Sequence, residues 1–334
     1  MNHKKIAQLA GVSPSTVSKA LSGSAEINRE TAEKIRKIAI NVGYFKEKSK
    51  RKREYGNGSN LLIAVIVPEI MGFHYATIVT CIKNHVEAKG GHVAVYIQDF
   101  DPAKSTQILQ SIILRGATDG VILFSKPKLT MKPNIPMVYC GKDGGSELDS
   151  IGFDGEALVE DAVRFLTRQG HRRIGFVGEP HTYMAAQSFE KAMKKQGLDA
   201  QKAYMYSVEA RFEQIGHVAA LQILEQKERP TAILAAYDEV AIGLVSTLMQ
   251  HGIRVPEDIS VMGINNIPSA AHAQIPLTSV QTFSEAQYAT AVDVLYDRIL
   301  NENAPVRHIL IEHKIIERET TKAIGERARE TDRS

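Results

Sequence analysis

The run KKIAQLAGVSPSTVSKAL, residues 4–21, constrains the fold of this chain more than any other part of its sequence. Ile6, Leu9 and Ala10 recur at the spacing of one buried helical stripe, and Gly11 ends that helix. A second stripe of the same spacing follows the glycine. Two short helices joined by a turn that contains glycine form a helix-turn-helix. The sequence therefore predicts this unit at its amino end.

The second helix of this unit carries a polar outward face. Ser13 is a good N-cap for it, and Pro14 is tolerated at the first helical position, where its missing N–H loses no hydrogen bond. Small hydroxyl side chains and one cation on such a face fit a major groove and reach phosphates and base edges. The residues of the face are Ser15, Thr16, Ser18, Lys19 and Ser22. An ordinary helical hairpin with a polar outside is the alternative that these residues alone leave open.

Charge is distributed unevenly along the chain. Residues 1–58 hold 13 of the 41 lysines and arginines but only five of the 38 acidic residues, which gives a net charge of +8. The rest of the chain holds 28 basic and 33 acidic residues and has a net charge of −5. A basic head of this size is typical of a module that binds phosphate groups.

A third helix completes the basic head. Ser24 or Asn28 can cap a segment in which apolar residues recur at helical spacing until Gly43. Three helices over about 45 residues bury a small core, so we expect the head to be the less stable part of the molecule.

These residues resemble the DNA-binding head of the lactose/galactose repressor (LacI/GalR) family. The resemblance is carried by IAQLAGVSPSTVSKALSG and INRETAEKIRKIAINVGY. It implies base-reading positions at Pro14, Ser15 and Lys19 and phosphate-contacting positions at Thr16 and Ser18. Of these, Lys19 can make a strong guanine contact through the O6 and N7 atoms. The resemblance therefore implies that the partner is double-stranded operator DNA.

The segment after the head departs from the family pattern. The family continues with a Pro-Asn pair and a hinge helix whose leucine wedges into the minor groove. Here Lys46 replaces the proline, Arg53 replaces the leucine, and six of the eight residues from Lys46 to Arg53 are basic. We expect residues 46–59 to form a basic arm that contacts phosphates or a narrow minor groove through Lys50, Arg51 and Arg53. A plain solvated linker is the alternative.

Beyond this segment, one pattern occurs twice. Apolar runs alternate with amphipathic segments of helical length, first as LLIAVIV, HVAVYI, GVILF and MVYC, then as RIGFVG, residues 204–208, AILAA, ISVMGI and residues 279–283. This alternation predicts right-handed βαβ units and parallel sheets covered on both faces. We therefore expect an α/β body of two similar, doubly wound lobes, with ligands at the carboxyl ends of the strands, in the cleft between the lobes.

The family resemblance extends through this body, on RGATDGVIL, QGHRRIGFVG, YDEVAIG, GIRVPEDISVMG and IIERETT. It implies a periplasmic-binding-protein-like effector domain with three crossovers between its lobes, near 156–159, 282–285 and 312–315. The expected domains are a helix-turn-helix head at 1–45, a basic linker at 46–59, an effector-binding and dimerisation domain at 60–325, and a polar tail at 326–334. We expect the first lobe at 60–157 and 284–313, and the second at 158–282 and 314–325.

The resemblance also implies effector contacts in the loops that follow the strands. The candidates are His74, Tyr75, Phe124, Ser125, Arg211, Tyr237, Asp238 and Asn265. Phe212 competes with Arg211 for one position, because the local alignment can slip by one residue. For Tyr75, core packing near a helix start is the alternative to stacking on a ligand.

Three positions depart from the sugar-binding pattern of the family. Ala185 stands where an arginine clamps the ligand, Asn265 replaces an aspartate, and Gly141 stands where sugar-binding members carry an acid. These changes remove groups suited to gripping sugar hydroxyls. We therefore expect an effector other than a simple hexose. The alternative is a domain that has lost its small molecule and answers to a protein co-effector.

Catalytic and metal-binding motifs are missing from the sequence. It contains no GxSxG, GxxxxGK[ST], GxGxxG or HExxH, and its eleven histidines do not cluster at ligand spacing. A structural role is expected for His171, and Cys81 and Cys140, far apart and without a CxxC, are expected to be buried free thiols. We therefore predict no catalytic residue, no metal ligand and no cofactor, and a regulator in place of an enzyme.

The sequence has no apolar run near 18 residues, and the basic head leaves no place for a signal peptide. We expect a cytoplasmic protein without a membrane partner, which disfavours a secreted solute-binding protein. One small head reads few base pairs, so we expect a homodimer on a pseudo-palindromic operator. The predicted function is a sequence-specific transcriptional regulator, a repressor in preference to an activator. We expect an unknown effector in the cleft between the lobes to modulate it.

Overall fold

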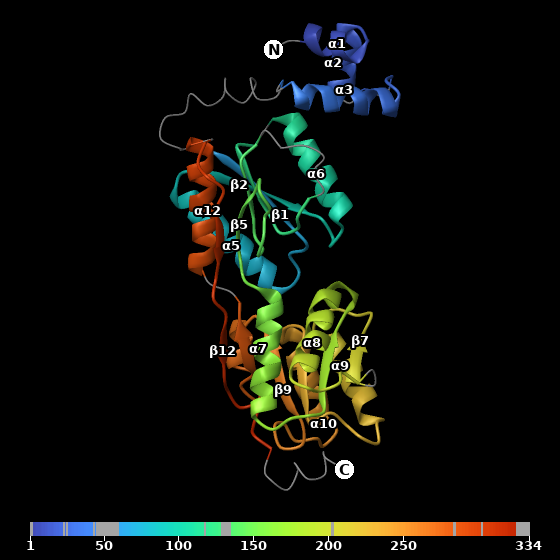
Figure 1. Cartoon of the computed structure of the whole chain (residues 1–334), viewed down its shortest axis with the longest axis vertical. Helices are drawn as coiled ribbons and strands as arrows, with labels where there is room; N and C mark the ends of the chain where they lie inside the picture. Colours follow the sequence, from blue (N-terminus) through green and yellow to red (C-terminus); the bar gives the residue numbers. More distant parts are fainter. Residues whose placement is uncertain are drawn as a thin grey trace. The chain divides into compact units, whose positions relative to one another are not determined.

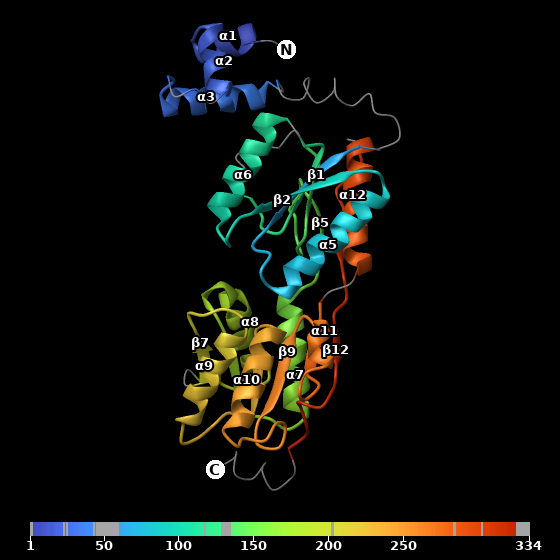
Figure 2. The same cartoon turned by 180° about the vertical axis from the view of Figure 1, so that it is seen from behind.

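The computed structural model describes residues 3–22, 24, 26–42, 44, 60–116, 118–127, 135–201, 204–282, 285–301 and 303–324. Contacts divide the chain into two units (Figures 1 and 2). The first comprises Met1–Met71, Tyr75–Ile151 and Glu285–Ile309, and the second comprises Gly72–His74, Gly152–Ser284 and Leu310–Ser334. Each unit contains one six-stranded sheet. We call the sheet and its helices the first lobe and the second lobe, and describe the amino-terminal helices separately as the head.

The head consists of three helices, α1 (His3–Ala10), α2 (Pro14–Ser22) and α3 (Arg29–Asn41). Apolar side chains from all three form one cluster, in which Ile6, Val17 and Ile35 are wholly buried. The predicted helix-turn-helix is therefore present. One residue of its predicted stripe is wrong: Leu9 is 55 % exposed and Ala7 is buried in its place. A helix of eight residues has too few apolar positions for the spacing alone to choose between these two residues.

Side-chain caps begin the second and third helices. The Ser13 Oγ accepts a hydrogen bond of 3.1 Å from the Thr16 amide, as predicted. For α3 the structure selects Asn28 over Ser24, because the Asn28 Oδ1 accepts a hydrogen bond of 2.9 Å from the Thr31 amide. Short polar residues thus satisfy backbone donors that would otherwise lack a partner at both helix starts.

The first lobe is a doubly wound sheet in the order β11-β5-β4-β3-β1-β2. Its strands are β1 (Leu62–Val67), β2 (His92–Ile97), β3 (Gly120–Leu123), β4 (Met137–Tyr139), β5 (Asp149–Gly152) and β11 (His308–Leu310). Its helices are α5 (Phe73–Ala88), α6 (Pro102–Arg115) and α12 (Glu285–Leu300). The neighbouring strands from β2 to β5 pair in parallel, as predicted.

β5 was not predicted as a strand, because its sequence DSIG is short and half polar. An ion pair explains how its first residue is buried. Asp149 is 1 % exposed and accepts hydrogen bonds of 2.8 and 2.9 Å from the Arg298 guanidinium of α12. Arg298 also donates to the carbonyls of Ala304 and Pro305. The pair therefore links β5, α12 and the segment that leads into β11.

The second lobe repeats the arrangement in the order β12-β10-β9-β8-β6-β7. Its strands are β6 (Ile174–Gly178), β7 (Met205–Ser207), β8 (Ala232–Ala235), β9 (Ser260–Ile264), β10 (Thr278–Gln281) and β12 (Lys314–Ile316). Its helices are α7 (Gly155–Arg168), η2 (Pro180–Thr182), α8 (Tyr183–Lys195), α9 (Glu213–Leu224), α10 (Asp238–Gln250) and α11 (Pro268–Ala271). β12 pairs antiparallel with β10, an exception to the predicted parallel pairing that an edge strand permits.

Two glycines let α9 and α10 pack closely in the second lobe. A Cβ atom on Gly216 would lie 2.1 Å from the Val240 carbonyl oxygen, and one on Gly243 would lie 2.1 Å from the Glu213 carbonyl oxygen. Both contacts involve backbone atoms, so no side-chain rotation can relieve them. These helices cover one face of a fully buried strand, β8.

Each sheet reverses its strand order at one place, between β1 and β3 in the first lobe and between β6 and β8 in the second. In doubly wound sheets, ligands bind outside the carboxyl ends of the strands at such a switch point. The residues that follow these four strands are therefore the first place to look for ligand contacts.

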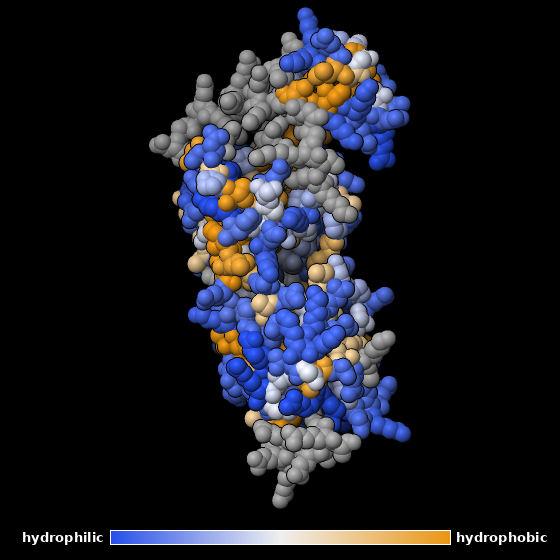
Figure 3. Space-filling view, viewed as in Figure 1, coloured by the Kyte–Doolittle hydropathy of each residue, from blue (hydrophilic) through white to orange (hydrophobic). Residues whose placement is uncertain are grey.

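The surface of the lobes is largely polar. Figure 3 shows hydrophilic residues over most of the described surface on the face drawn, as expected when the apolar residues form the cores. Of the helices in the described ranges, none has the length and apolar composition needed to cross a bilayer.

Candidate DNA-binding face and ligand-contacting residues

The exposed face of α2 carries most of the predicted DNA-contacting residues. Pro14, Ser15, Ser18 and Lys19 are exposed, and Thr16 is partly buried. Val17 and Ala20, on the opposite side of the helix, are buried in the head core. Ser22 is the last residue of α2, and Lys50, Arg51 and Arg53 lie outside the described residues. The fold therefore presents hydroxyl groups and one ammonium group together on one side of α2.

The hydroxyl groups at the start of α2 contact one another. The Ser13 Oγ lies 2.7 Å from the Ser15 Oγ and 2.8 Å from the Thr16 Oγ1. Since Ser13 also accepts from the Thr16 amide, the cap fixes the side chains that begin the polar face.

Lys19 has an acidic partner that the sequence did not reveal. Its ammonium group contacts the carboxylate of Glu26, which lies in the turn between α2 and α3. Both side chains remain accessible, with 50 % of the lysine and 67 % of the glutamate exposed. The folded turn brings Glu26 back toward α2, and a hydrogen bond of 3.0 Å from the Ser24 amide to the Lys19 carbonyl closes that turn.

In the first lobe, two predicted effector-contacting residues meet at the switch point. Tyr75, in the first turn of α5, and Phe124, after β3, pack edge to face with ring centroids 6.0 Å apart. Phe100 packs edge to face on Tyr75, and Tyr288 of α12 stacks on Phe124 at 6.2 Å. Sequence reasoning missed Phe100 and Tyr288, because no local pattern relates the loop after β2 and the helix α12 to the switch point.

The other two first-lobe candidates lie in the same loops. His74 precedes Tyr75 in the first turn of α5, and the Ser125 hydroxyl accepts a hydrogen bond from the Gln98 amide. Gln98 is fully buried, and its Oε1 has no hydrogen-bond partner among the described residues. Gln98 is thus a further polar group at the carboxyl end of this sheet that the sequence did not single out.

The structure gives a reason for the glycine at position 141. A Cβ atom there would lie 2.3–2.5 Å from atoms of the Tyr139 ring. In this rotamer the tyrosine lies where the side chain of a residue at 141 would begin, so an acidic residue there would require Tyr139 to move. Burial raises the pKa of Tyr139, so its hydroxyl stays protonated and does not replace the missing negative charge.

In the second lobe, Glu179 joins the candidates at the switch point. It follows β6, and its carboxylate accepts hydrogen bonds of 2.7 Å from the Tyr237 hydroxyl and 2.5 Å from the Arg211 guanidinium. The Arg211 guanidinium also lies over the Phe212 ring, 4.8 Å from its centroid. Burial and the contact with Glu179 raise the pKa of Tyr237, which therefore acts as a hydrogen-bond donor. The structure thus brings Arg211, Phe212 and Tyr237 together around an acid that was not predicted.

Asp238 is enclosed within the second lobe. Its carboxylate accepts hydrogen bonds of 2.6 Å from the Ser279 hydroxyl and 2.7 Å from the Ile267 amide, and the residue is 0 % exposed. Burial raises its pKa to about 7, although both hydrogen bonds favour the ionised form. A Cβ atom on Gly263 would lie 2.2 Å from the Asp238 carboxylate, so the absence of a side chain there makes room for it. Asp238 therefore holds the loop after β9 in place.

Two further positions complete the second-lobe set. Asn265 follows β9 with a φ of +104°, and its Oδ1 accepts a hydrogen bond of 2.9 Å from the Thr282 hydroxyl. Ala185 lies on α8 and packs against the apolar cluster that contains Phe176 and Phe189. The residue at the position of the family arginine therefore contributes to core packing.

The residues expected to be structural behave as such. His171 is 2 % exposed, and its ring nitrogens lie 3.1 Å from the Thr231 hydroxyl and 3.1 Å from the Lys322 carbonyl. Cys81 and Cys140 are free, as predicted, and both residues are partly exposed, although the thiol group of Cys140 is buried as expected. Burial of its thiol group raises the pKa of Cys140 to about 12. Within the described ranges, no three metal-ligating side chains converge on one point.

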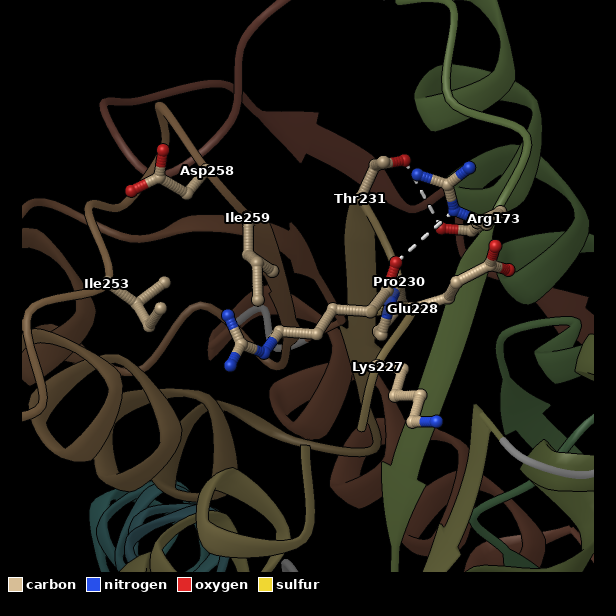
Figure 4. A pocket seen from close by; sticks show the side chains of 9 residues that line it. Arg173, Lys227, Glu228, Pro230, Thr231, Ile253, Asp258 and Ile259 are labelled. Carbon is tan, nitrogen blue, oxygen red and sulfur yellow. Dashed lines mark hydrogen bonds between the residues drawn. The ribbon is translucent and has the colours of Figure 1, made fainter. Parts of the chain in front are cut away.

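A surface cavity of about 550 Å³ lies at the amino ends of β6, β8 and β9, away from the predicted effector residues of this lobe. Figure 4 shows Ile253 and Asp258 on one side of it and Arg173 and Thr231 on the other. Its arginines serve the fold: Arg229 donates to the carbonyls of the last two residues of α9, and Arg173 donates to the Arg229 carbonyl. This cavity therefore marks a helix-to-strand junction.

Known families match both parts of the chain. Residues 4–47 match the family described as bacterial regulatory proteins, lacI family. Residues 163–321 match the family described as periplasmic binding protein-like domain. The predicted head and effector domain are each matched in part by one of these families.

Curated relatives align along almost the whole chain. The HTH-type transcriptional repressor CytR of Escherichia coli K12 is 25 % identical over 332 residues, which cover 96 % of each chain. The HTH-type transcriptional repressor PurR of Haemophilus influenzae PittEE is 27 % identical over 339 residues, which cover 96 % of this chain and 98 % of the relative.

Solved structures of regulators share the fold. A putative LacI regulator from Bacillus cereus subsp. cytotoxis superposes with a TM-score of 0.69 at 20 % identity, over 80 % of this chain and 100 % of that one. A regulator from Silicibacter pomeroyi superposes with a TM-score of 0.69 at 21 % identity, over 96 % of this chain and 99 % of that one. The predicted fold class is confirmed. The helix-turn-helix head thus matches the lacI family of bacterial regulatory proteins, most of the second lobe lies within the match to the periplasmic binding protein-like domain, and almost the whole chain is similar to transcriptional repressors that have this architecture.

Proposed function

We propose that this protein is a repressor that binds a pseudo-palindromic operator as a homodimer and whose affinity for that operator changes when an effector binds. The observation that carries the proposal is the exposed face of α2, held on a closed three-helix core by the buried Val17 and Ala20. Repression is supported by the names of the relatives CytR and PurR, both called transcriptional repressors.

In this proposal α2 enters the major groove. Hydroxyl groups bond phosphates and base edges, Pro14 gives an apolar contact, and Lys19 bonds guanine. The residues assigned to the face are Pro14, Ser15, Thr16, Ser18, Lys19 and Ser22. The basic arm adds phosphate or minor-groove contacts through Lys50, Arg51 and Arg53. One α2 reaches few base pairs, so two heads related by a two-fold axis are needed for a specific site.

The experiment that tests DNA binding is genome-wide capture of fragments by the purified full chain, followed by affinity measurements on the best site between 50 and 200 mM salt. We expect a short pseudo-palindrome and a steep loss of affinity with salt. Replacing Lys50, Arg51 and Arg53 by glutamine should reduce the slope of log affinity against log salt by roughly five for a dimer, at about 0.9 per phosphate contact. Capture without sequence preference would contradict the operator proposal, and an unchanged slope would contradict the role of the arm.

We infer that the effector contacts residues in the loops that follow the strands, at and beside the switch points of the two sheets. In the first lobe these are His74, Tyr75, Phe124 and Ser125, and in the second Arg211, Tyr237 and Asn265. Asp238 is left out because protein donors enclose its carboxylate. The paired aromatic rings of the first lobe support stacking on a ring or on the apolar face of a ligand.

The proposed effector is a molecule other than a simple hexose. Position 141 has no acid and faces the Tyr139 ring, Ala185 packs against the second-lobe core, and the Arg211 guanidinium pairs with Glu179. Two solved regulators hold disaccharides, sucrose in one from Lactobacillus casei and cellobiose in CelR. Thermal shift with glucose, sucrose and cellobiose is the direct test, because a ligand at 100 times its Kd stabilises the folded protein by about 2.7 kcal/mol.

Tight, saturable binding of glucose would contradict this inference. A second candidate, control by a protein co-effector, is favoured by the same loss of hexose-gripping groups. It predicts that a broad library of small metabolites leaves the melting temperature unchanged while a protein partner alters operator affinity. A metabolite that stabilises the protein and changes operator affinity would contradict this second candidate.

A further inference from the structure

We propose that Glu26 is a specificity-determining residue that positions Lys19 for guanine and withholds it from phosphate. The inference rests on the proposed role of α2 as the helix that enters the major groove. It begins from the contact between the Lys19 ammonium and the Glu26 carboxylate, which joins the exposed face of α2 to the turn before α3.

Glu26 differs from the other described acids of the head in what it touches. Glu33 pairs with Arg29 on α3, at 3.4 Å. Glu30 lies in the first turn of α3, where a carboxylate is favoured by the helix dipole. Glu26 contacts a side chain of the proposed base-reading set. In a head with a net charge of +8, its carboxylate is therefore the negative group that a bound DNA backbone meets beside Lys19.

The chemistry of the pair matches one base pair. An ammonium group has three N–H donors, so one can stay with Glu26 while two bond the O6 and N7 atoms of guanine. The carboxylate can accept a hydrogen bond from the N4 amino group of the paired cytosine. Lysine and glutamate together thus present the complement of a G·C pair. A lysine without the glutamate would bind a phosphate as well as a guanine, because a phosphate is bound by a single positive charge.

The test compares Glu26→Gln with Glu33→Gln in the full-length protein. Each variant removes one acidic charge from the head, so any general electrostatic gain is common to both. Affinity is measured on the best operator and on a random-sequence duplex, across the same salt range. Because both side chains of the Lys19–Glu26 pair are exposed, Glu26→Gln should fold like the wild type, and circular dichroism verifies this.

We expect Glu26→Gln, but not Glu33→Gln, to bind the random duplex more tightly and with a steeper salt dependence. Freeing Lys19 for one phosphate in each head should steepen the log–log slope by roughly 1.8 for a dimer. The ratio of operator to random affinity should fall by about fivefold or more, the lower end of the discrimination that a bidentate base contact supplies. Glu26→Asp, which keeps the charge, should restore most of that ratio.

A double variant separates positioning from simple repulsion. In the Lys19→Met background, Glu26→Gln should have the same effect as Glu33→Gln, because the side chain that Glu26 positions is gone. Equal slopes and ratios for Glu26→Gln and Glu33→Gln would overturn the proposal, and so would an effect of Glu26→Gln that persists without Lys19. If the wild type prefers no site, the operator proposal fails, yet the slopes on random duplex still decide the role of Glu26.

Discussion

The hydroxyl of Tyr237 donates a hydrogen bond of 2.7 Å to the carboxylate of Glu179, and this contact links the loop after β8 to the loop after β6 at the switch point of the second lobe. Glu179 is 5 % exposed, and Arg211 supplies its opposite charge. A buried carboxylate with two donors is stable, whereas removal of a donor leaves part of its charge without compensation.

Replacing Tyr237 by phenylalanine should destabilise the protein by about 1–3 kcal/mol, because a buried acceptor loses a donor. Urea unfolding of the wild type and the variant measures this difference. Tyr183→Phe is the matched control: its side chain is 58 % exposed, and it should change the stability by less than about 0.5 kcal/mol. Equal stability of Tyr237→Phe and the wild type would show that the contact does not hold the loops.

Gly243→Ala should destabilise the second lobe by about 1–3 kcal/mol or more, since the new methyl group would meet a backbone carbonyl at 2.1 Å and force α9 and α10 apart. The melting temperature reports this loss. Gly155→Ala serves as the comparison, because a Cβ atom at that position meets nothing within 4 Å. If Gly243→Ala and Gly155→Ala had the same melting temperature, the close approach of α9 and α10 would be disproved.

Arg298→Met should destabilise the protein by about 3 kcal/mol, because it removes the closer ion-pair partner of the buried Asp149 carboxylate and leaves only the Arg307 guanidinium, at 3.8 Å. The double variant Arg298→Met with Asp149→Asn should recover part of the loss, since the buried charge is gone. Chemical unfolding of both variants provides the test, and a double variant less stable than Arg298→Met would argue against this account.

Ser13→Ala should speed hydrogen exchange of the amides in α2, and Asn28→Ala should do the same in α3, since each removes a cap worth about 1 kcal/mol. Exchange read by mass spectrometry separates the two helices. Each variant is the control for the other. If each variant speeds hydrogen exchange equally in α2 and α3, the caps stabilise the head as a whole and not single helices.

Asp238 should make stability fall with rising pH. Its pKa is raised to about 7 in the folded protein, so the folded state binds this proton more tightly than the unfolded state. The resulting stabilisation is complete below the ordinary pKa, near 4, and is lost as the pH rises to about 7. Asp238→Asn cannot titrate and should lose less stability between pH 5 and pH 8. Parallel pH profiles of urea midpoint for wild type and variant would contradict this expectation.

Local rules predicted local features of this fold. The Ser13 cap and the strand runs around β1, β6, β8 and β9 follow from short stretches of sequence, and the structure contains them. The exposed Leu9 shows the limit of such rules in a short helix, where neighbouring apolar residues fit the same stripe.

Contacts between distant segments could not be predicted in this way. The partners of Glu179 come from the loops after two other strands, β7 and β8. Glu26 reaches Lys19 because the turn before α3 folds back on α2. The contact that a side chain at position 141 would make with the Tyr139 ring likewise depends on the rotamer of Tyr139 in the folded chain. The resemblance to a family predicted effector contacts in the loops after the strands, whereas contacts within this chain determine which side chains of those loops are already hydrogen-bonded.

The last strands of the two sheets have a consequence for synthesis on the ribosome. β11 and β12 come from residues 308–316, whereas the strands they cover, β5 and β10, emerge earlier. Until those residues leave the exit tunnel, β5 and β10 are unpaired edges in addition to β2 and β7, and such edges are templates for pairing with other chains. Each sheet is therefore complete only after residues 308–316 have been synthesised, so the edges at β5 and β10 stay open to pairing with other chains until then.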